Sequence, residues 1–297
     1  MPELDTLRGV AVSLVVCYHA FGFGYGLSGL SGIPKFLVSL TMAGWTGVNL
    51  FFVLSGFLIT GILLDTKERP DYYRRFYIRR ALRILPLYYA VLLLLLVLTR
   101  LHWVPRHARW SFLGLSAIYL ANVTELFHVP MQYGVLWSLG VEEHFYLVWP
   151  TILRPLSRRN LMICAVAVAC ACLGLRSFYF LHGYIIGGYI WLRADGLAIG
   201  ALLACVIRSP VNARNAVRNL SGLAITASLL LLAAGAPFGI LHAAHFLGQT
   251  LRETCLDFFC MGVIGLTLLV GTSSWKIAVN RSVFQFLGKI SYGVWCW

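Results

Sequence analysis

The amino-acid sequence predicts an all-α protein, a polytopic transmembrane helical bundle of about ten hydrophobic helices with the last one truncated. Hydrophobic residues make up 59% of the 297 residues, charged residues make up 12%, and the mean hydropathy is +0.79. A soluble domain has roughly 45–50% apolar and 25% charged residues. Long apolar runs recur along the chain, which excludes a disordered or collagen-like protein. No linker or internal repeat separates these runs, so residues 1–297 are expected to form a single domain.

A membrane-spanning helix needs about 20 mostly apolar residues. The expected helices lie, in order, near residues 8–26, 45–64, 84–100, 112–125, 137–153, 160–182, 186–207, 220–241 and 253–272. A tenth begins near Ile290 and stops at Trp297, which is too short to cross, so the chain is expected to end inside its last helix. The opening residues lack the basic start of a signal peptide, so the first helix should stay attached.

The basic residues between the runs predict the orientation. Seven of them follow the second run: Lys67, Arg69, Arg74, Arg75, Arg79, Arg80 and Arg83. Three later loops are also basic, through Arg154, Arg158 and Arg159, then Arg208, Arg214 and Arg218, then Lys276, Arg281 and Lys289. The positive-inside rule places the first stretch and the N-terminus in the cytoplasm. The three later loops join that side only if residues 112–125 do not cross, so we expect that run to be re-entrant or interfacial.

The net charge of +13 is better explained by this orientation, or by contact with anionic headgroups, than by binding of nucleic acid. The eight cysteines lie in apolar stretches without metal-type spacing and are expected to pack in the core or face lipid. His242 and His245 lack a third ligand nearby, so no metal site is expected. The acidic pair Glu253 and Asp257 is expected to be structural or interfacial.

Ionisable residues inside apolar runs mark functional or paired positions. Arg8 and His19 are eleven residues apart, which places them within roughly 20° of one helix face and about 16 Å apart along the axis. The functional interpretation is a cation for an anionic ligand near the cytoplasmic surface and a general base deeper in the membrane. The alternative is a buried histidine that a neighbouring helix satisfies.

Arginines cluster in residues 72–89 at helical spacing. Arg80 and Arg83 share a face, and Arg79 lies beside them. Guanidinium groups at this spacing suit phosphate oxygens, so a substrate that bears a pyrophosphate and enters from the cytoplasm is indicated. The alternative is an anchor for lipid headgroups, which we favour for Arg74 and Arg75.

The run at residues 136–150 opens with two carboxylates. Glu142 and Glu143 diverge by about 100° on a helix, whereas Ser138 and Glu142 share a face. The predicted topology puts this cluster in the outer half of the membrane, where it could orient a hydroxyl acceptor or pair with a histidine. The alternative is a structural ion pair, with His144 merely interfacial.

Residues 191–204 bring Arg193 and Asp195 into an apolar run. A buried aspartate near an arginine usually has a partner on another helix. The small residues Gly196 and Gly200 allow a close approach of that helix. Both charged residues are therefore candidates for lining an outer cavity.

Six blocks, in this order, closely resemble the integral-membrane acyltransferase 3 family: LDTLRGVAVSLVVCYHA, GVNLFFVLSGFLIT, FYIRRALRILPLYY, LWSLGVEEHFYLVWP, RADGLAIGALLA and LGKISYGVW. The resemblance covers nearly the whole chain. That family includes bacterial O-acyltransferases of O-antigen, exopolysaccharide, peptidoglycan and nodulation factors, and macrolide acyltransferases.

The resemblance assigns roles residue by residue. The Arg-x10-His motif of the family falls on Arg8 and His19, which become the leading catalytic candidates. Its Arg-x-x-Arg element falls on Arg80 and Arg83. Asn49 departs from the family pattern, which often has Asp there, and an amide keeps hydrogen bonding without the charge.

Two further family blocks fall on residues 55–59, which carry SGFLI, and on residues 137–143, which carry the WSL-x-x-E pattern. We expect no esterase-like domain after the last helix, although such a domain follows it in some members.

The resemblance implies an acetyl-CoA-dependent O-acyltransferase of the bacterial cytoplasmic (inner) membrane, with no permanently bound cofactor. Arg80 and Arg83, helped by Arg79, would clamp the phosphates of the acyl-CoA co-substrate. His19 would act as base or accept the acyl group, and Glu142 would orient the imidazole or bind the acceptor. The order expected across the membrane is arginines inside, His19 in the middle and carboxylates further out. The other expected substrate contacts are Ser138, Glu143, Arg193, Asp195 and Asn49.

The expected partners are the acyl-CoA donor, a carbohydrate or lipid-linked glycan acceptor and membrane lipids, without nucleic acid. One alternative is a polytopic transporter or flippase, in which His19, Glu142 and Asp195 form a relay. Inverted repeats would support it, and the sequence contains none. A non-catalytic scaffold is disfavoured by the charged residues inside apolar runs.

Overall fold

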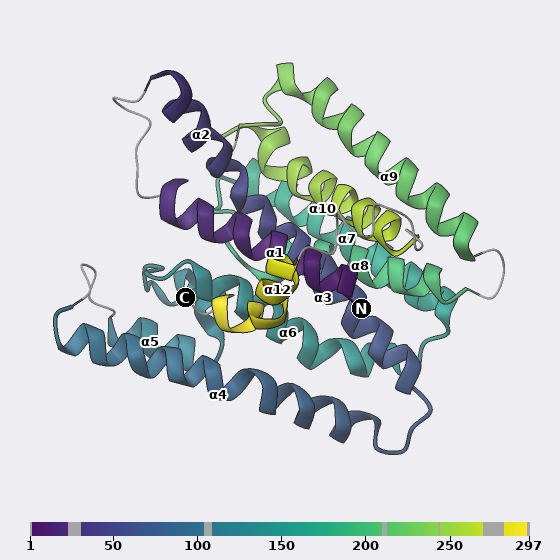
Figure 1. The fold of residues 1–297 in the computed structure, drawn as a ribbon, viewed down its shortest axis with the longest axis horizontal. Coiled ribbons are helices and arrows are strands. Elements are labelled where there is room, and N and C mark those ends of the chain that lie inside the picture. The colour runs from purple at the N-terminus through teal and green to yellow at the C-terminus, as the bar shows by residue number, and fades with distance from the viewer. Residues whose placement is uncertain are drawn as a thin grey trace.

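The computed structural model describes residues 2–22, 31–103, 109–209, 213–242, 244–269 and 282–295. Every regular element among these residues is helical, as predicted (Figure 1). They include eleven α-helices rather than the expected ten. The difference arises partly because short helices form in segments that are too short or too polar to read as apolar runs.

The first half of the chain contains α1 (Pro2–Cys17), the π-helical turn η1 (Tyr18–Gly22), α2 (Gly32–Met42), η2 (Ala43–Thr46), α3 (Gly47–Thr66), α4 (Tyr72–Arg100), α5 (Trp110–Ala117) and η3 (Leu120–Phe127). The second half contains α6 (Val135–Leu153), α7 (Arg158–Leu181), α8 (Ile190–Ile207), α9 (Ala213–Gly235), η4 (Ala236–Phe238), α10 (Phe246–Leu269) and α12 (Ser282–Trp295).

Six segments of the described chain are long and apolar enough to span a membrane. They are Glu3–Phe21, Val38–Thr66, Tyr72–Arg100, Arg158–Leu181, Ile190–Ile207 and Arg214–Phe238. The expected runs 137–153 and 253–272 form α6 and α10, which are helical but are not among these six. Both helices carry carboxylates whose partners lie on other helices, so their sequence is more polar than that of a lipid-facing span.

Five expected helix starts are too late: the helices expected to start near residues 8, 84, 220, 253 and 290 begin at Pro2, Tyr72, Ala213, Phe246 and Ser282. The run expected at 84–100 is the second half of α4, whose arginine-rich first half from Tyr72 is also helical. The tenth helix begins at Ser282, eight residues before Ile290. Apolar content misses the start of α4 because its arginine-rich first half continues the hydrogen bonding of the helix outside the apolar run.

The segment expected to be re-entrant is broken into two short helices, α5 and η3. Tyr119 separates them with a φ of 61°, in the left-handed region, and His128 ends η3 with a φ of 55°. Neither piece is long enough to cross a hydrocarbon core of about 30 Å.

α3 and α8 form the centre of the bundle, and α4 and α9 lie on opposite sides of it (Figure 1). In α8, 83% of the apolar stretch is buried, against 22% in α4. Glycines allow the two central helices to touch: a Cβ on Gly56 would lie 1.9 Å from the Leu197 carbonyl oxygen, and one on Gly200 would lie 2.0 Å from that of Val53. The predicted close approach at Gly200 is therefore confirmed.

Three of the four basic stretches meet at one end of the described bundle, which we call the arginine end. Lys67, which follows α3, donates to the Leu156 carbonyl oxygen after α6 at 2.6 Å. Arg208, at the end of α8, forms two 2.7 Å hydrogen bonds with Asp65 of α3. Two of the three later basic loops thus lie beside the basic stretch that follows α3, as expected if residues 112–125 do not cross the membrane. The third loop, 270–281, lies outside the described residues.

Candidate active site

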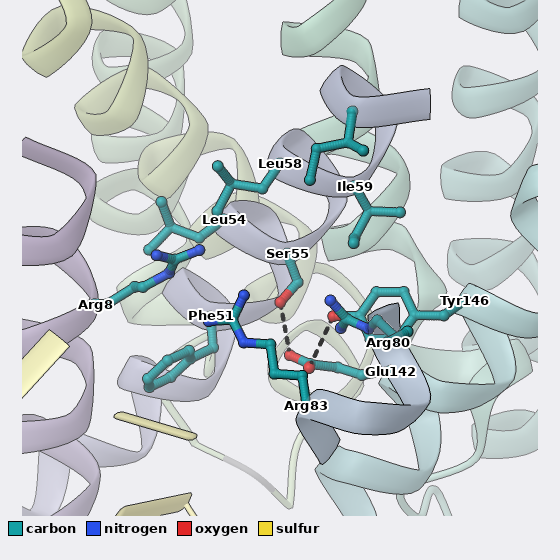
Figure 2. A pocket seen from close by; sticks show the side chains of 11 residues that line it. Arg8, Phe51, Leu54, Ser55, Leu58, Ile59, Arg80, Arg83, Glu142 and Tyr146 are labelled. Carbon is teal, nitrogen blue, oxygen red and sulfur yellow. Dashed lines mark hydrogen bonds between the residues drawn. The ribbon is translucent and has the colours of Figure 1, made fainter. Parts of the chain in front are cut away.

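A small cavity of about 70 Å³ lies between α1, α3, α4 and α6; we call it the lower cavity. Three arginines and one glutamate supply its charged groups. Figure 2 shows Arg8 pointing into it from α1 and Arg80 and Arg83 from α4, beside Glu142 of α6. Its full lining is Arg8, Phe51, Leu54, Ser55, Leu58, Ile59, Ile62, Arg80, Arg83, Glu142 and Tyr146.

Glu142 is fixed by two hydroxyl groups. Its Oε1 accepts a hydrogen bond from the Ser55 hydroxyl and its Oε2 accepts one from the Tyr146 hydroxyl, both at 2.9 Å. Tyr146 lies four residues after Glu142, on the same face of α6. The guanidinium carbon of Arg80 lies 3.5 Å from the centre of the Tyr146 ring, a cation–π contact. Because three guanidinium groups surround one carboxylate, the lower cavity suits an anionic ligand.

A second cavity of about 490 Å³ contains His19; we call it the upper cavity. It is lined by Val15, Tyr18, His19, Trp45, Val48, Glu125, Met131, Gly134, Trp137, Arg176, Ile185, Ile186, Gly187, Gly188, Arg193, Gln249, Arg252 and Glu253. The Nδ1 atom of His19 lies 2.9 Å from the Val15 carbonyl oxygen. Since a carbonyl oxygen only accepts, we assign the proton of the neutral ring to Nδ1 and the lone pair to Nε2. The neutral ring is therefore set up as a base at Nε2.

The two cavities are stacked along the same helices. On α1, Arg8 lines the lower cavity and Val15 lines the upper one, seven residues further along the same face. On α3, Phe51 lines the lower cavity and Val48 lines the upper one, about 4.5 Å apart along the axis. On α6, Trp137 lines the upper cavity and Glu142, later in the sequence, lines the lower one, as on α3. The cavities therefore form one column that runs from the arginine end towards His19.

Buried charges form one wall of the upper cavity. Arg193 of α8 forms an ion pair with Glu253 of α10, and its guanidinium carbon lies 5.7 Å from the Trp137 ring centre. The Asn49 amide donates to Glu253 Oε2 at 3.2 Å and to Asp257 Oδ1 at 2.8 Å. Both carboxylates of the acidic pair, for which a structural or interfacial role is predicted, connect α10 to neighbouring helices.

A second buried ion pair lies next to the first. Arg176 of α7 donates to Asp195 Oδ2 of α8 at 2.7 Å, and both side chains are at most 1% exposed. Thr254 of α10 donates to the same carboxylate oxygen at 2.8 Å. Asp195 thus has the expected partner on another helix. The two pairs connect α7, α8 and α10 and fix the wall behind the upper cavity.

The structure brings most of the predicted site residues into this column. Arg8, Arg80, Arg83 and Glu142 meet in the lower cavity, and His19 faces the upper one. The expected position of Glu142 beyond the histidine is wrong. The carboxylate lies on the arginine side, because α6 places Glu142 one turn closer to that end than Trp137.

Other predicted residues lie beside the column. Arg79 lines a groove that opens next to the lower cavity. Asn49 and Asp195 are buried in the charged wall. Ser138 donates to the Val135 carbonyl oxygen at 3.1 Å, and neither it nor Glu143 is among the described residues that line the two cavities. Their roles stay predictions.

Several lining residues were not singled out in the sequence. Arg176 could have been found, because it is a single arginine inside the apolar run 160–182. Glu125, whose carboxylate accepts from the Tyr189 hydroxyl at 2.9 Å, lies at the end of the run 112–125. Arg252, whose guanidinium carbon lies 4.6 Å from the Trp45 ring centre, carried no signal of its own.

Comparison with known protein families identifies the chain. The model of the acyltransferase domain, acyltransferase 3, matches residues 1–297. The chain belongs to the acyltransferase 3 family. The predicted resemblance is therefore confirmed over the full length. Among the residues that the structure describes, no group of three or more His, Cys, Asp or Glu side chains is placed to hold a metal ion.

The relatives of this acyltransferase-family protein include named O-acetyltransferases. Peptidoglycan O-acetyltransferase OatA of Listeria monocytogenes is 27% identical over 334 residues, which cover all of this chain and 48% of that protein. The putative peptidoglycan O-acetyltransferase YrhL of Bacillus subtilis is 34% identical over 52% of this chain and 24% of its own length. A putative O-acetyltransferase of Staphylococcus aureus is 29% identical over all of this chain and 50% of that protein. The chain spans about half the length of the relatives that it matches throughout, and no solved structure matches it.

Proposed function

We propose that this protein is a membrane O-acyltransferase that moves an acyl group from cytoplasmic acyl-CoA to a carbohydrate hydroxyl. The proposed acyl group is acetyl. Membership of the acyltransferase 3 family supports this reaction class, and it disfavours the transporter. Two relatives are named for peptidoglycan, so peptidoglycan or its precursor is the proposed acceptor.

The stacked column of cavities is the observation that carries the proposal. The arginine end, placed in the cytoplasm by the positive-inside rule, would take the phosphates of the donor. The pantetheine arm would then extend through the lower cavity past Ser55 and Glu142 towards His19. The wider upper cavity has room for a sugar, with the faces of Trp45 and Trp137 on its walls.

His19 would act as the general base. Its Nε2 takes the proton of the acceptor hydroxyl while the hydroxyl oxygen attacks the thioester carbonyl carbon. The new C–O bond replaces the C–S bond, and the departing thiolate recovers the proton from the imidazolium. The hydrogen bond from Nδ1 to the Val15 carbonyl oxygen would hold the ring in the required tautomer.

The remaining charged residues would position the donor and the cavity walls. Arg8 forms a 2.9 Å ion pair with Asp5, which holds its guanidinium group at the lower cavity. Glu142, which is itself fixed by two hydroxyl groups, would attract the guanidinium groups of Arg8 and Arg80 and so orient them in the lower cavity. We therefore treat Arg8 and Glu142 as positioning residues for the donor.

The test is transfer of label from radioactive acetyl-CoA to peptidoglycan precursors by membranes that contain the full-length protein. We expect His19→Gln to lower transfer by about 10²–10⁴-fold, the usual contribution of a general base. His182→Gln is the matched control, because the Nδ1 atom of His182, like that of His19, lies 2.9 Å from the carbonyl oxygen four residues back, here that of Phe178. His182 lines neither cavity.

Equal rates for the two variants at equal abundance would remove His19 from the chemistry. No transfer by the parent protein to any glycan acceptor would contradict the proposed function.

A further inference from the structure

A basic groove of about 350 Å³ lies between α3 and the first three turns of α4, at the arginine end. Its lining is Ile59, Ile62, Thr66, Arg69, Tyr72, Arg75, Phe76, Arg79, Arg80 and Arg83. Five of these ten residues are arginines and none is acidic. Four of them also line the lower cavity, namely Ile59, Ile62, Arg80 and Arg83, so the groove opens into the column described above.

Four of the five arginines of the groove lie in two groups at its ends. Arg80 and Arg83 lie at its inner end, where it meets the lower cavity. Arg69 and Arg75 lie at its outer end, and Arg75 is about 12 Å from Arg83 along the axis of α4. The floor between the two groups includes Phe76, which is 7% exposed. Arg79 lies between the two groups on α4, so the groove offers cations at both ends and at its centre, above an apolar floor.

Asp71 holds the outer pair in place. Its Oδ1 accepts from Arg69 Nε at 2.9 Å, and its Oδ2 lies 3.9 Å from Arg75 Nη1. Asp71 itself does not line the groove. Since a guanidinium group has five N–H donors, each arginine retains donors for a ligand while Asp71 orients it.

The order of the groups along the groove matches the chemistry of coenzyme A, the donor in the proposed function. The pantetheine arm leaves from the pyrophosphate, so the pyrophosphate must lie at the inner end for the arm to enter the lower cavity. The ribose 3′-phosphate and the adenine are on the other side of the pyrophosphate, and so they lie further out. A second anion site is required there, and Arg69 and Arg75 are the cations present.

We propose that Arg69 and Arg75 bind the ribose 3′-phosphate of coenzyme A, while the adenine lies on the floor at Phe76. This inference rests on the proposed function, because it places one part of the same donor. It assigns the outer arginines to a specific phosphate rather than to the general charge of the membrane surface.

Arg74 provides a matched control on the same helix turn. It lines a neighbouring hollow with Asp71, Arg75, Ile78 and Arg79; Arg75 and Arg79 line both the hollow and the groove, whereas Arg74 does not line the groove. A lipid headgroup at this surface would engage Arg74 as well as Arg75. A 3′-phosphate in the groove would engage Arg75 and not Arg74.

The experiment measures binding of coenzyme A and of 3′-dephospho-coenzyme A to the purified full-length protein by calorimetry in uncharged detergent. We expect the parent protein to bind coenzyme A about 10–100-fold more tightly, the range for losing charge-assisted hydrogen bonds. Arg69→Gln and Arg75→Gln should each reduce this preference and leave the affinity for the dephospho compound unchanged. Arg80→Gln should weaken both ligands equally, and Arg74→Gln should weaken neither.

The dephospho compound also reports folding, because a misfolded variant would lose both ligands. Equal affinity of the parent for the two ligands would overturn the 3′-phosphate assignment and leave the proposed function intact. Binding of neither ligand would contradict the proposed function itself. A loss with Arg74→Gln as large as with Arg75→Gln, or loss of the preference in nanodiscs containing anionic lipid, would assign these arginines to headgroups.

Discussion

The buried pair of Arg176 and Asp195 predicts a large and specific loss of stability. The two side chains are 0% and 1% exposed, and the ion pair measures 2.7 Å. In Arg176→Met, Asp195 keeps, among the described residues, the 2.8 Å hydrogen bond from Thr254 and the more distant charge of Arg193. An uncompensated buried charge typically costs about 3–5 kcal/mol. We therefore expect the free energy of unfolding of Arg176→Met to fall by about that amount.

The second variant separates charge from packing. Replacing a whole buried ion pair by apolar residues of similar volume is often nearly neutral, so Arg176→Met combined with Asp195→Leu should recover most of the loss. Reversible unfolding in mixed detergent micelles, followed by tryptophan fluorescence, measures both. A cost below about 1 kcal/mol for the single variant, or a double variant as unstable as the sum of the singles, would refute the reasoning.

Three further predictions concern packing, buried charge and pH. Gly200→Val should destabilise the bundle by more than the 1–3 kcal/mol typical of overpacking, because a Cβ there would lie 2.0 Å from a carbonyl oxygen of α3. Gly222→Val, with open space around it, should change the melting temperature little, and equal effects would contradict this account. Asn49→Asp should cost about 3 kcal/mol in the same unfolding assay, since it adds a carboxylate beside two buried ones; unchanged stability would count against it. The hydrogen bond from Arg69 holds the pKa of Asp71 below its ordinary value. The stability that this pair contributes is therefore fully present above the unfolded pKa of about 3.9, and it is lost as the pH falls through the lower folded pKa. Arg69→Gln should raise the pKa of Asp71 in a carboxyl-carbon NMR titration, and an unmoved midpoint would show that the hydrogen bond contributes nothing.

The sequence predicted the fold class because the composition and length of each apolar run can be read without knowing which helices it packs against. Apolar runs place helices wherever backbone groups must be satisfied inside a bilayer. The sequence missed the start of α4 at Tyr72, since an arginine-rich turn continues a helix without adding hydropathy. It also placed the start of the last helix too late, near Ile290 instead of at Ser282.

The pairing of Arg80 and Arg83 on one face was predictable, because helical spacing alone fixes it. The position of Glu142 was not, because it depends on how far α6 is shifted relative to α1 and α4. The positive-inside rule assigned Glu142 to the outer half of the membrane, beyond His19, because it says nothing about the shift of one helix against another.

The sequence by itself determined an all-helical membrane protein, its family and the candidate residues of its site, since each of these depends on neighbours along one helix or on blocks in order. Only the tertiary structure decided which charges meet. Asn49 and Asp257 are 208 residues apart and lie within hydrogen-bonding distance. Such contacts depend on the rotation and shift of packed helices, which are fixed by close approaches such as Gly56 against Leu197 and not by any local pattern. The stacking of a basic cavity beneath the histidine cavity is likewise a product of that packing.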